Sequence, residues 1–177
     1  YGAGDLSALR RSIYVSLLLI GTVTILLNVA VFLWLDPILR WLQVPYDIYP
    51  LMRNYLWIIF WGIVFTFLYN FYAALLRAVG DSVTPLWFLA VSVVLNIGLD
   101  LFLILVLDQG IEGAAVATVI AQGTAASGIL LYTYKIRPEL RLHREDMRFD
   151  RSSLREITSF STLTCVQQSV MNFGILM

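Results

Sequence analysis

Residues 85–107 read PLWFLAVSVVLNIGLDLFLILVL, an apolar run that contains a single charged residue, Asp100. A helix of about 20 apolar residues is long enough to cross the hydrocarbon core of a membrane. Asn96 lies one helical turn before Asp100, and Ser92 lies one turn before Asn96, so the three share a face. A carboxylate at bilayer depth costs about 2.5–3.5 kcal/mol on insertion scales. Such a residue usually faces protein or a water-filled cavity and marks the path of an ion, a proton or a substrate.

The composition of the whole chain is that of an integral membrane protein. Of its 177 residues, 59% are hydrophobic and 14% are charged, whereas a soluble domain usually carries about 25% charged residues. Basic and acidic residues are balanced at 12 each, so the basic excess typical of a nucleic-acid-binding protein is missing. The one cysteine, Cys165, cannot form a disulfide framework within the chain. We therefore expect the lipid bilayer, and no nucleic acid, as a partner.

Five segments are apolar and long enough to span a bilayer, which predicts an all-α, polytopic transmembrane helix bundle. The first is expected to stop before Asp36-Pro37, because the residue preceding a proline usually lies outside a helix. The third carries Pro85 in its first turn, where a missing N–H is tolerated. The predicted spans are residues 13–35, 55–76, 86–107, 111–134 and 157–177.

Basic residues are concentrated in three stretches that lie on one side if every span crosses. Residues 1–12, the connection after the second span and the charged segment 135–156 together hold 10 of the 12 basic residues. The positive-inside rule makes this side cytoplasmic. We therefore predict a multi-pass protein of the cytoplasmic membrane, with Asp100 in the outer half of the bilayer. Because the chain begins without Met and ends inside an apolar run, we also expect it to be a piece of a longer polypeptide.

Asp100 and Asn96 are the first candidates for an ion site. Carboxylate and amide oxygens are the ligands that hard cations prefer, and a carboxylate can also take up and release a proton. The alternative is a helix–helix contact in which Asp100 only hydrogen-bonds to a neighbour. Contacts of that kind contribute about 0.6 kcal/mol on average in membrane bundles. The presence of Asp and Asn on one face favours the ion site.

Other polar residues within the predicted spans are interpreted either as lining the cavity of Asp100 or as helix-packing groups. Thr118 and Gln122 lie one turn apart near the middle of their span and are candidates to face the same cavity as Asp100. Asn70 is expected in the inner half of the membrane, at some distance from Asp100. Asn28, in the first span, is interpreted as a packing group. A stripe of small residues that favours close helix packing comprises Gly113, Ala117, Ala121 and Ala125.

Catalytic motifs are missing from the sequence. It contains no nucleophile elbow, phosphate loop, CxxC or HExxH pattern. A single histidine and a single cysteine give no basis for dyad chemistry or a transition-metal site. We therefore predict that the protein is not an enzyme and has no cofactor.

Several short motifs occur together in an informative order. They are LRAVGD at 76–81, TP at 84–85, LNIGLD at 95–100 and GIEGAAVATVIAQ at 110–122, preceded by YGAGD at 1–5. Over about residues 1–135 this order and spacing resembles the multidrug and toxic compound extrusion (MATE) family of transporters. The resemblance implies that the five spans are the third to seventh of twelve, arranged in two bundles.

The domain organisation follows from that resemblance. It implies that residues 1–134 are part of an N-terminal six-helix bundle, that 135–156 are a cytoplasmic linker, and that 157–177 begin a C-terminal bundle. The remaining spans of a longer parent chain would then pack against the five spans of this one as partners. The Gly-Pro pair that many members carry early in the seventh span is not found here.

The resemblance also implies a function. It predicts export of drugs or toxic organic compounds, with organic cations as expected substrates, in exchange for sodium ions or protons. The family's cation site maps onto Asn70, Asn96, Asp100 and Thr118, and a sodium ion at these residues is the only metal implied. The acidic residue that the family carries on its first span has no counterpart in this chain.

Two other functions stay open at this point. A lipid-linked saccharide flippase of related architecture is one, although it would be expected to carry basic residues inside its spans, and this chain has none there. A non-transporting membrane subunit is the other. In that case Asp100 would be a packing contact, and its loss would reduce stability without an ion-dependent effect.

Overall fold

The computed structural model describes residues 6–141 and the isolated positions 158, 159, 161, 162 and 167. Within these residues the chain is helical and has no strand. Four of the helices are long and apolar enough to cross a membrane, which confirms the all-α transmembrane class. The predicted fifth span, and the linker beyond residue 141, lie outside the continuous described range. The elements are α1 (Leu6–Trp41), α2 (Tyr49–Ala78), α3 (Val83–Leu101), the π-helical η1 (Phe102–Val106), α4 (Gly110–Ile136) and the 3-10 turn η2 (Pro138–Leu140).

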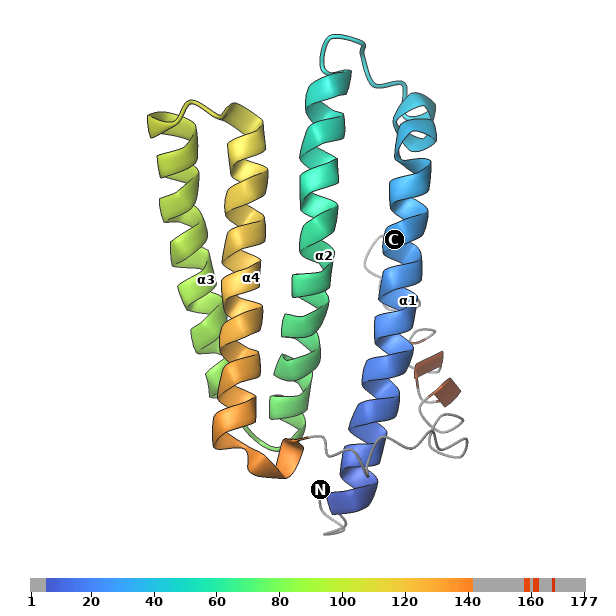
Figure 1. Ribbon diagram of the computed structural model, residues 1–177, viewed down its shortest axis with the longest axis vertical. Coiled ribbons are helices and arrows are strands. Elements are labelled where there is room, and N and C mark those ends of the chain that lie inside the picture. Colours follow the sequence, from blue (N-terminus) through green and yellow to red (C-terminus); the bar gives the residue numbers. More distant parts are fainter. Residues whose placement is uncertain (1–5, 142–157, 160, 163–166, 168–177) are drawn as a thin grey trace. The chain divides into compact units, whose positions relative to one another are not determined.

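The chain divides into two compact units, one of residues 21–138 and one of residues 1–20 with 139–177. In the first of these units, α4 packs between α2 and α3 (Figure 1). The predicted small-residue stripe of α4 explains this position, because all four of its members are buried. Without large side chains, α4 lets both neighbours approach closely. Ile129 is fully buried on the same helix and fills the space beyond the stripe.

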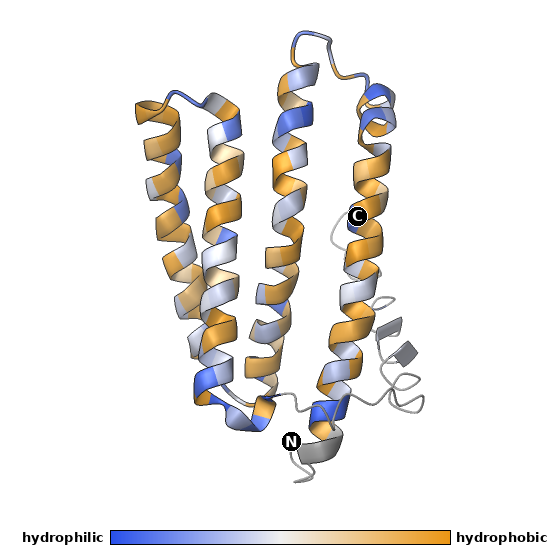
Figure 2. Ribbon diagram, viewed as in Figure 1, coloured by the Kyte–Doolittle hydropathy of each residue, from blue (hydrophilic) through white to orange (hydrophobic). Residues whose placement is uncertain are grey.

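Hydrophobic residues make up much of the four long helices, and hydrophilic residues gather near the helix ends (Figure 2). Many of the large hydrophobic side chains are exposed. Leu33 and Leu105 are both 74% exposed and Val94 is 71% exposed. Such a surface is suited to a lipid solvent rather than to water. At the connection from α1 to α2, Trp41 and Tyr46 are also exposed, which fits the aromatic residues typical of a membrane boundary.

Helix α1 continues through Asp36-Pro37 to Trp41 instead of ending at residue 35 as predicted. Leu35 and Leu39, on either side of the proline, are buried. Oδ1 of Asp36 accepts hydrogen bonds from the Tyr49 hydroxyl and from Nε of Arg53, both at 2.9 Å. These contacts hold the last turns of α1 in place although Pro37 cannot donate a backbone hydrogen bond. The proline rule was wrong here because it takes no account of packing beyond the proline.

The turn from α2 to α3 is a Schellman motif. The Asp81 N–H donates to the Leu76 carbonyl at 2.9 Å, and the Gly80 N–H donates to the Arg77 carbonyl at 3.1 Å. Gly80 has a φ of 91°, a conformation that glycine adopts without steric cost. The Gly-Asp pair that closes the LRAVGD motif therefore ends α2.

Asp81 also caps the start of α3. Its Oδ1 accepts a hydrogen bond from the Thr84 N–H at 3.0 Å, and its Oδ2 accepts one from the Thr84 hydroxyl at 2.8 Å. From the end of α4, Nη2 of Arg137 lies 3.7 Å from the same Oδ2. The bond from the Thr84 N–H, assisted by the Thr84 hydroxyl and the Arg137 charge, holds the pKa of Asp81 below its ordinary value.

This cap predicts a pH-dependent contribution to stability. A carboxyl whose pKa is lowered by folding stabilises the protein above its unfolded pKa of about 3.9 and loses that contribution as the pH falls through the folded value. Asp81→Ala should therefore lower the free energy of unfolding by about 1 kcal/mol at pH 7, and by less at pH 3. Thermal unfolding of the purified parent protein at both pH values measures this. An equal loss at pH 7 and pH 3 would mean that the carboxylate charge is irrelevant.

Candidate functional site

A seam of polar contacts joins α3 to α4 at one-turn intervals. The buried Ser92 hydroxyl donates to the Ala121 carbonyl at 2.9 Å. One turn further along α3, Nδ2 of Asn96 lies 3.4 Å from the hydroxyl oxygen of Thr118. That hydroxyl donates to its own helix, at the Ala114 carbonyl. The structure therefore brings together two of the four predicted site residues, Asn96 and Thr118.

Asp100 lies one turn beyond this contact on the same face of α3. Its Oδ1 is buried and has no hydrogen-bond partner among the described residues. A buried carboxylate oxygen without a donor is costly, because it gives up its interactions with water and gains none in return. Asp100 therefore remains a candidate to bind a ligand through this oxygen.

The α-helix gives way to a π-helical segment two residues after Asp100. Residues Phe102–Val106 form a π-helical segment, in which the Leu107 N–H donates to the Phe102 carbonyl at 3.2 Å. Short π-helical segments within α-helices are frequent at functional sites. Sequence reasoning missed this segment, since FLILV is as compatible with an α-helix as with a π-helix.

Asn70, the fourth predicted site residue, lies at a cavity of about 200 Å³ between α2, α3 and α4. Its amide donates to the Thr66 carbonyl at 2.9 Å on its own helix. The cavity connects Asn70 with Ser92, at the start of the polar seam, and does not include Asp100. Its lining consists of Thr66, Tyr69, Asn70, Leu89, Ser92, Gln122 and Ala125.

Gln122 is held at this cavity by the close approach of α2. A Cβ atom added to Gly62 would lie 2.8 Å from Oε1 of Gln122 and 3.1 Å from Cγ2 of Val119. An alanine at position 62 would therefore require the end of the Gln122 side chain to shift and Val119 to yield by a few tenths of an ångström. The sequence indicated Gln122 through its spacing from Thr118, but nothing in it pointed to Gly62.

The contact between α1 and α2 supports a packing role for Asn28. Its buried Nδ2 donates to the Phe60 carbonyl at 2.7 Å. The rings of Phe32 and Trp61 pack beside this contact, with centroids 5.6 Å apart. Because the amide is satisfied by a backbone carbonyl, we assign Asn28 to helix packing.

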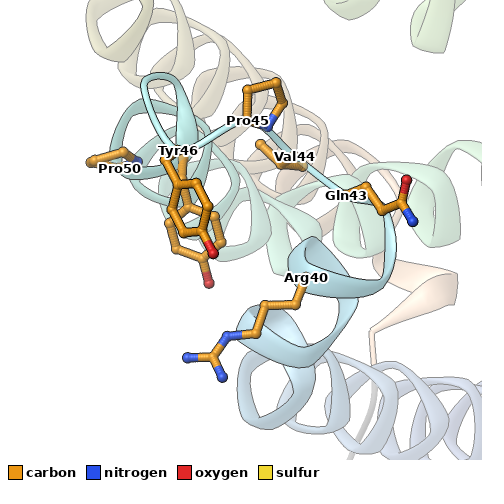
Figure 3. Close-up of a pocket in the computed structure, with 7 residues that line it drawn as sticks. Arg40, Gln43, Val44, Pro45, Tyr46 and Pro50 are labelled. Carbon is orange, nitrogen blue, oxygen red and sulfur yellow. The ribbon is translucent and has the colours of Figure 1, made fainter.

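A second hollow, of about 940 Å³, lies at the connection between α1 and α2 and is partly open to the surroundings. Figure 3 shows the residues that line it. Arg40 contributes its only charged side chain, and Tyr46 and Tyr49 contribute aromatic rings. None of the predicted site residues lines it. Among the described residues no group of three His, Cys, Asp or Glu side chains is placed to hold a metal ion, at this hollow or elsewhere.

Comparison with known proteins gives the family. The MatE family model matches residues 1–102. Probable multidrug resistance protein YpnP of Bacillus subtilis (strain 168) is 40% identical over 134 residues, which are 76% of this chain and 30% of that protein. YoeA of the same organism, also named a probable multidrug resistance protein, is 34% identical over 88% of this chain and 33% of its own length.

A third relative comes from a different organism. Probable multidrug resistance protein NorM of Thermotoga maritima is 32% identical over 71% of this chain and 28% of its own length. The chain thus spans about a third of the length of these relatives. No solved structure matches the chain significantly. Because the family model covers more than half of the chain, and its relatives cover most of it, this multi-pass membrane protein belongs to the MatE family of multidrug and toxic compound extrusion transporters.

Proposed function

We propose that the parent protein exports drugs or other toxic organic compounds across the cytoplasmic membrane in exchange for sodium ions or protons. Membership of the MatE family and the names of the relatives support the export of drugs. Organic cations are the proposed substrate class. The described helices supply part of such a transporter, and the remaining spans of the parent chain supply the rest.

The buried Oδ1 of Asp100, which has no donor within the described part of the chain, is the observation that carries this proposal. Asn96 and Thr118 lie within two turns of it along the seam and add oxygen atoms of the kind that a hard cation binds. Because Nδ2 of Asn96 is directed at Thr118, its amide oxygen is the atom available to act as a ligand. A sodium ion or a proton at Asp100 would remove the cost of the unpaired oxygen.

Exchange of the substrate for the coupling ion follows if both compete for the carboxylate of Asp100. A carboxylate can bind one cation or the other, but not both at full affinity, so binding of one weakens binding of the other. Access from alternate sides of the membrane then converts this competition into antiport. The cavity at Asn70 and Gln122 offers an uncharged polar lining for part of the substrate. At about 200 Å³ it is smaller than the roughly 300–1,000 Å³ of a drug-sized pocket.

The test uses the full-length parent protein in sealed vesicles loaded with ethidium, an organic cation. A sodium gradient and a proton gradient are imposed in turn, and each is then collapsed with an ionophore. We expect one of the two gradients to drive ethidium transport, and its collapse to abolish that transport. Vesicles without the protein are the control. Ethidium movement that is indifferent to both gradients would exclude cation-coupled antiport.

A further inference from the structure

The first turn of α3 is held from two sides. On the α2 side, the Tyr69 hydroxyl donates to the Pro85 carbonyl at 2.8 Å. On the α4 side, the hydroxyl oxygens of Thr84 and Tyr132 lie 3.3 Å apart. Since Thr84 gives its one hydroxyl proton to Asp81, Tyr132 is the donor in this second contact. The start of α3 is therefore linked by side-chain contacts to both α2 and α4.

Arg137 adds a charged contact to this cluster at the point where α4 ends. Its Nη2 lies 3.7 Å from Oδ2 of Asp81, and the two side chains are 32% and 12% exposed. Arg137 follows the last residue of α4, and the two compact units of the chain divide directly after Pro138. The charged pair thus joins the cap of α3 to the residue at which the chain leaves the helical unit.

We propose that Asp81 and Arg137 are a positioning pair, which passes displacement of the end of α4 to the helix that carries Asp100. Helix α3 is unbroken from Val83 to Leu101, so a shift of its first turn moves Asp100, about 24 Å further along at about 1.5 Å per residue. Neither member of the pair touches ion or substrate. The inference rests on the proposed antiport, because it assigns the pair a role in the conformational step that carries the loaded site between the two sides.

The contacts of Asp81 distinguish a positioning role of Arg137 from a role in stabilising the fold. Asp81 is already satisfied by two hydrogen bonds from Thr84, so the cap of α3 persists when Arg137 is replaced. A partly exposed ion pair also contributes little to folding. Loss of the Arg137 charge should therefore change how fast the transporter cycles and leave its fold and its binding affinities in place.

The experiment compares three variants of the full-length parent: Arg137→Gln, Arg137→Lys and, as the matched control, Lys135→Gln. Lys135 carries the same charge in the last turn of α4. We expect Arg137→Gln to lower the maximum rate of gradient-driven ethidium efflux about threefold to fivefold, the effect that a partly exposed ion pair supports. The concentrations of ethidium and of the coupling ion at half-maximal rate should stay within about twofold. Arg137→Lys should restore the rate, and Lys135→Gln should behave as wild type.

Hydrogen–deuterium exchange in the same proteins gives a readout that does not depend on transport. Arg137→Gln should speed exchange at the backbone amides of Thr84 and of residues 86–88, and Lys135→Gln should not. Unchanged exchange in Arg137→Gln, a wild-type maximum rate, or an equal loss of rate in Lys135→Gln would each overturn the positioning pair. If wild type shows no gradient-driven efflux at all, the proposed antiport fails, and the exchange data still decide whether the pair positions α3.

Discussion

Asp100→Asn should lower gradient-driven ethidium efflux by the full-length parent at least about tenfold. The substitution keeps the size and shape of the side chain, replaces one acceptor oxygen by an NH2 donor, and removes the charge that attracts a sodium ion or a proton. A charge-assisted contact is worth about 1.5–3 kcal/mol, which corresponds to a factor of ten or more in binding. The protein should remain folded, because a neutral amide at this depth is cheaper to bury than a carboxylate without a donor.

Asp108→Asn is the matched control for this measurement. Asp108 is an exposed carboxylate in the connection between η1 and α4, and its φ of 51° is one that asparagine also tolerates. Efflux by this variant should equal that of wild type at matched expression. If Asp100→Asn also exports at the wild-type rate, the carboxylate is a packing group, and the proposed role of Asp100 as the coupling site is wrong.

Much of the fold was predictable because a transmembrane helix can be recognised from its own stretch of sequence, without knowledge of its neighbours. A run of about 20 apolar residues has few other stable arrangements in a bilayer. The predicted spans 55–76 and 111–134 lie within α2 and α4, and the span 86–107 runs through α3 and η1 to one residue beyond η1. The small-residue stripe of α4 was also predictable as a packing surface, since its spacing of four places Gly113, Ala117, Ala121 and Ala125 on one face. In each case the deciding signal lies within one helix.

Features that depend on contacts between helices were not predictable. The pairing of Asp81 with Arg137 joins residues that are 56 positions apart in the sequence, and neither carries a local signal for the other. The extension of α1 past Pro37 depends on the contacts of Asp36 with Tyr49 and Arg53. For the candidate site, the sequence predicted that Asn96 and Asp100 share a helix face, because they are four residues apart. The separation of Asn70 from Asp100 was expected from their predicted depths in the membrane. The cavity that Asn70 shares with Ser92 was not predicted.

The packing of α3 against α4 leads to the second large expected effect. A Cβ atom added to Gly128 would lie 2.7 Å and 2.8 Å from two ring carbons of Phe88. The ring has little freedom to move away, because it packs edge-on against Tyr132 with centroids 6.0 Å apart. Gly128→Ala should therefore destabilise the parent protein through overpacking, at a cost of about 1–3 kcal/mol. This cost exceeds or cancels the gain of up to about 1 kcal/mol from placing alanine in a helix.

Gly98→Ala supplies the matched control, because a Cβ added to Gly98, in the last turn of α3, would meet nothing within 4 Å apart from its own stretch of helix. Thermal unfolding in detergent should show a lower midpoint for Gly128→Ala and an unchanged or higher midpoint for Gly98→Ala. Adding Phe88→Leu removes the ring that the new methyl group meets. The double variant should consequently be more stable than the sum of the two single losses predicts, since residues in contact do not act independently. Additive losses would show that Gly128 is required for a reason other than the Phe88 ring, such as close approach of the α3 and α4 backbones.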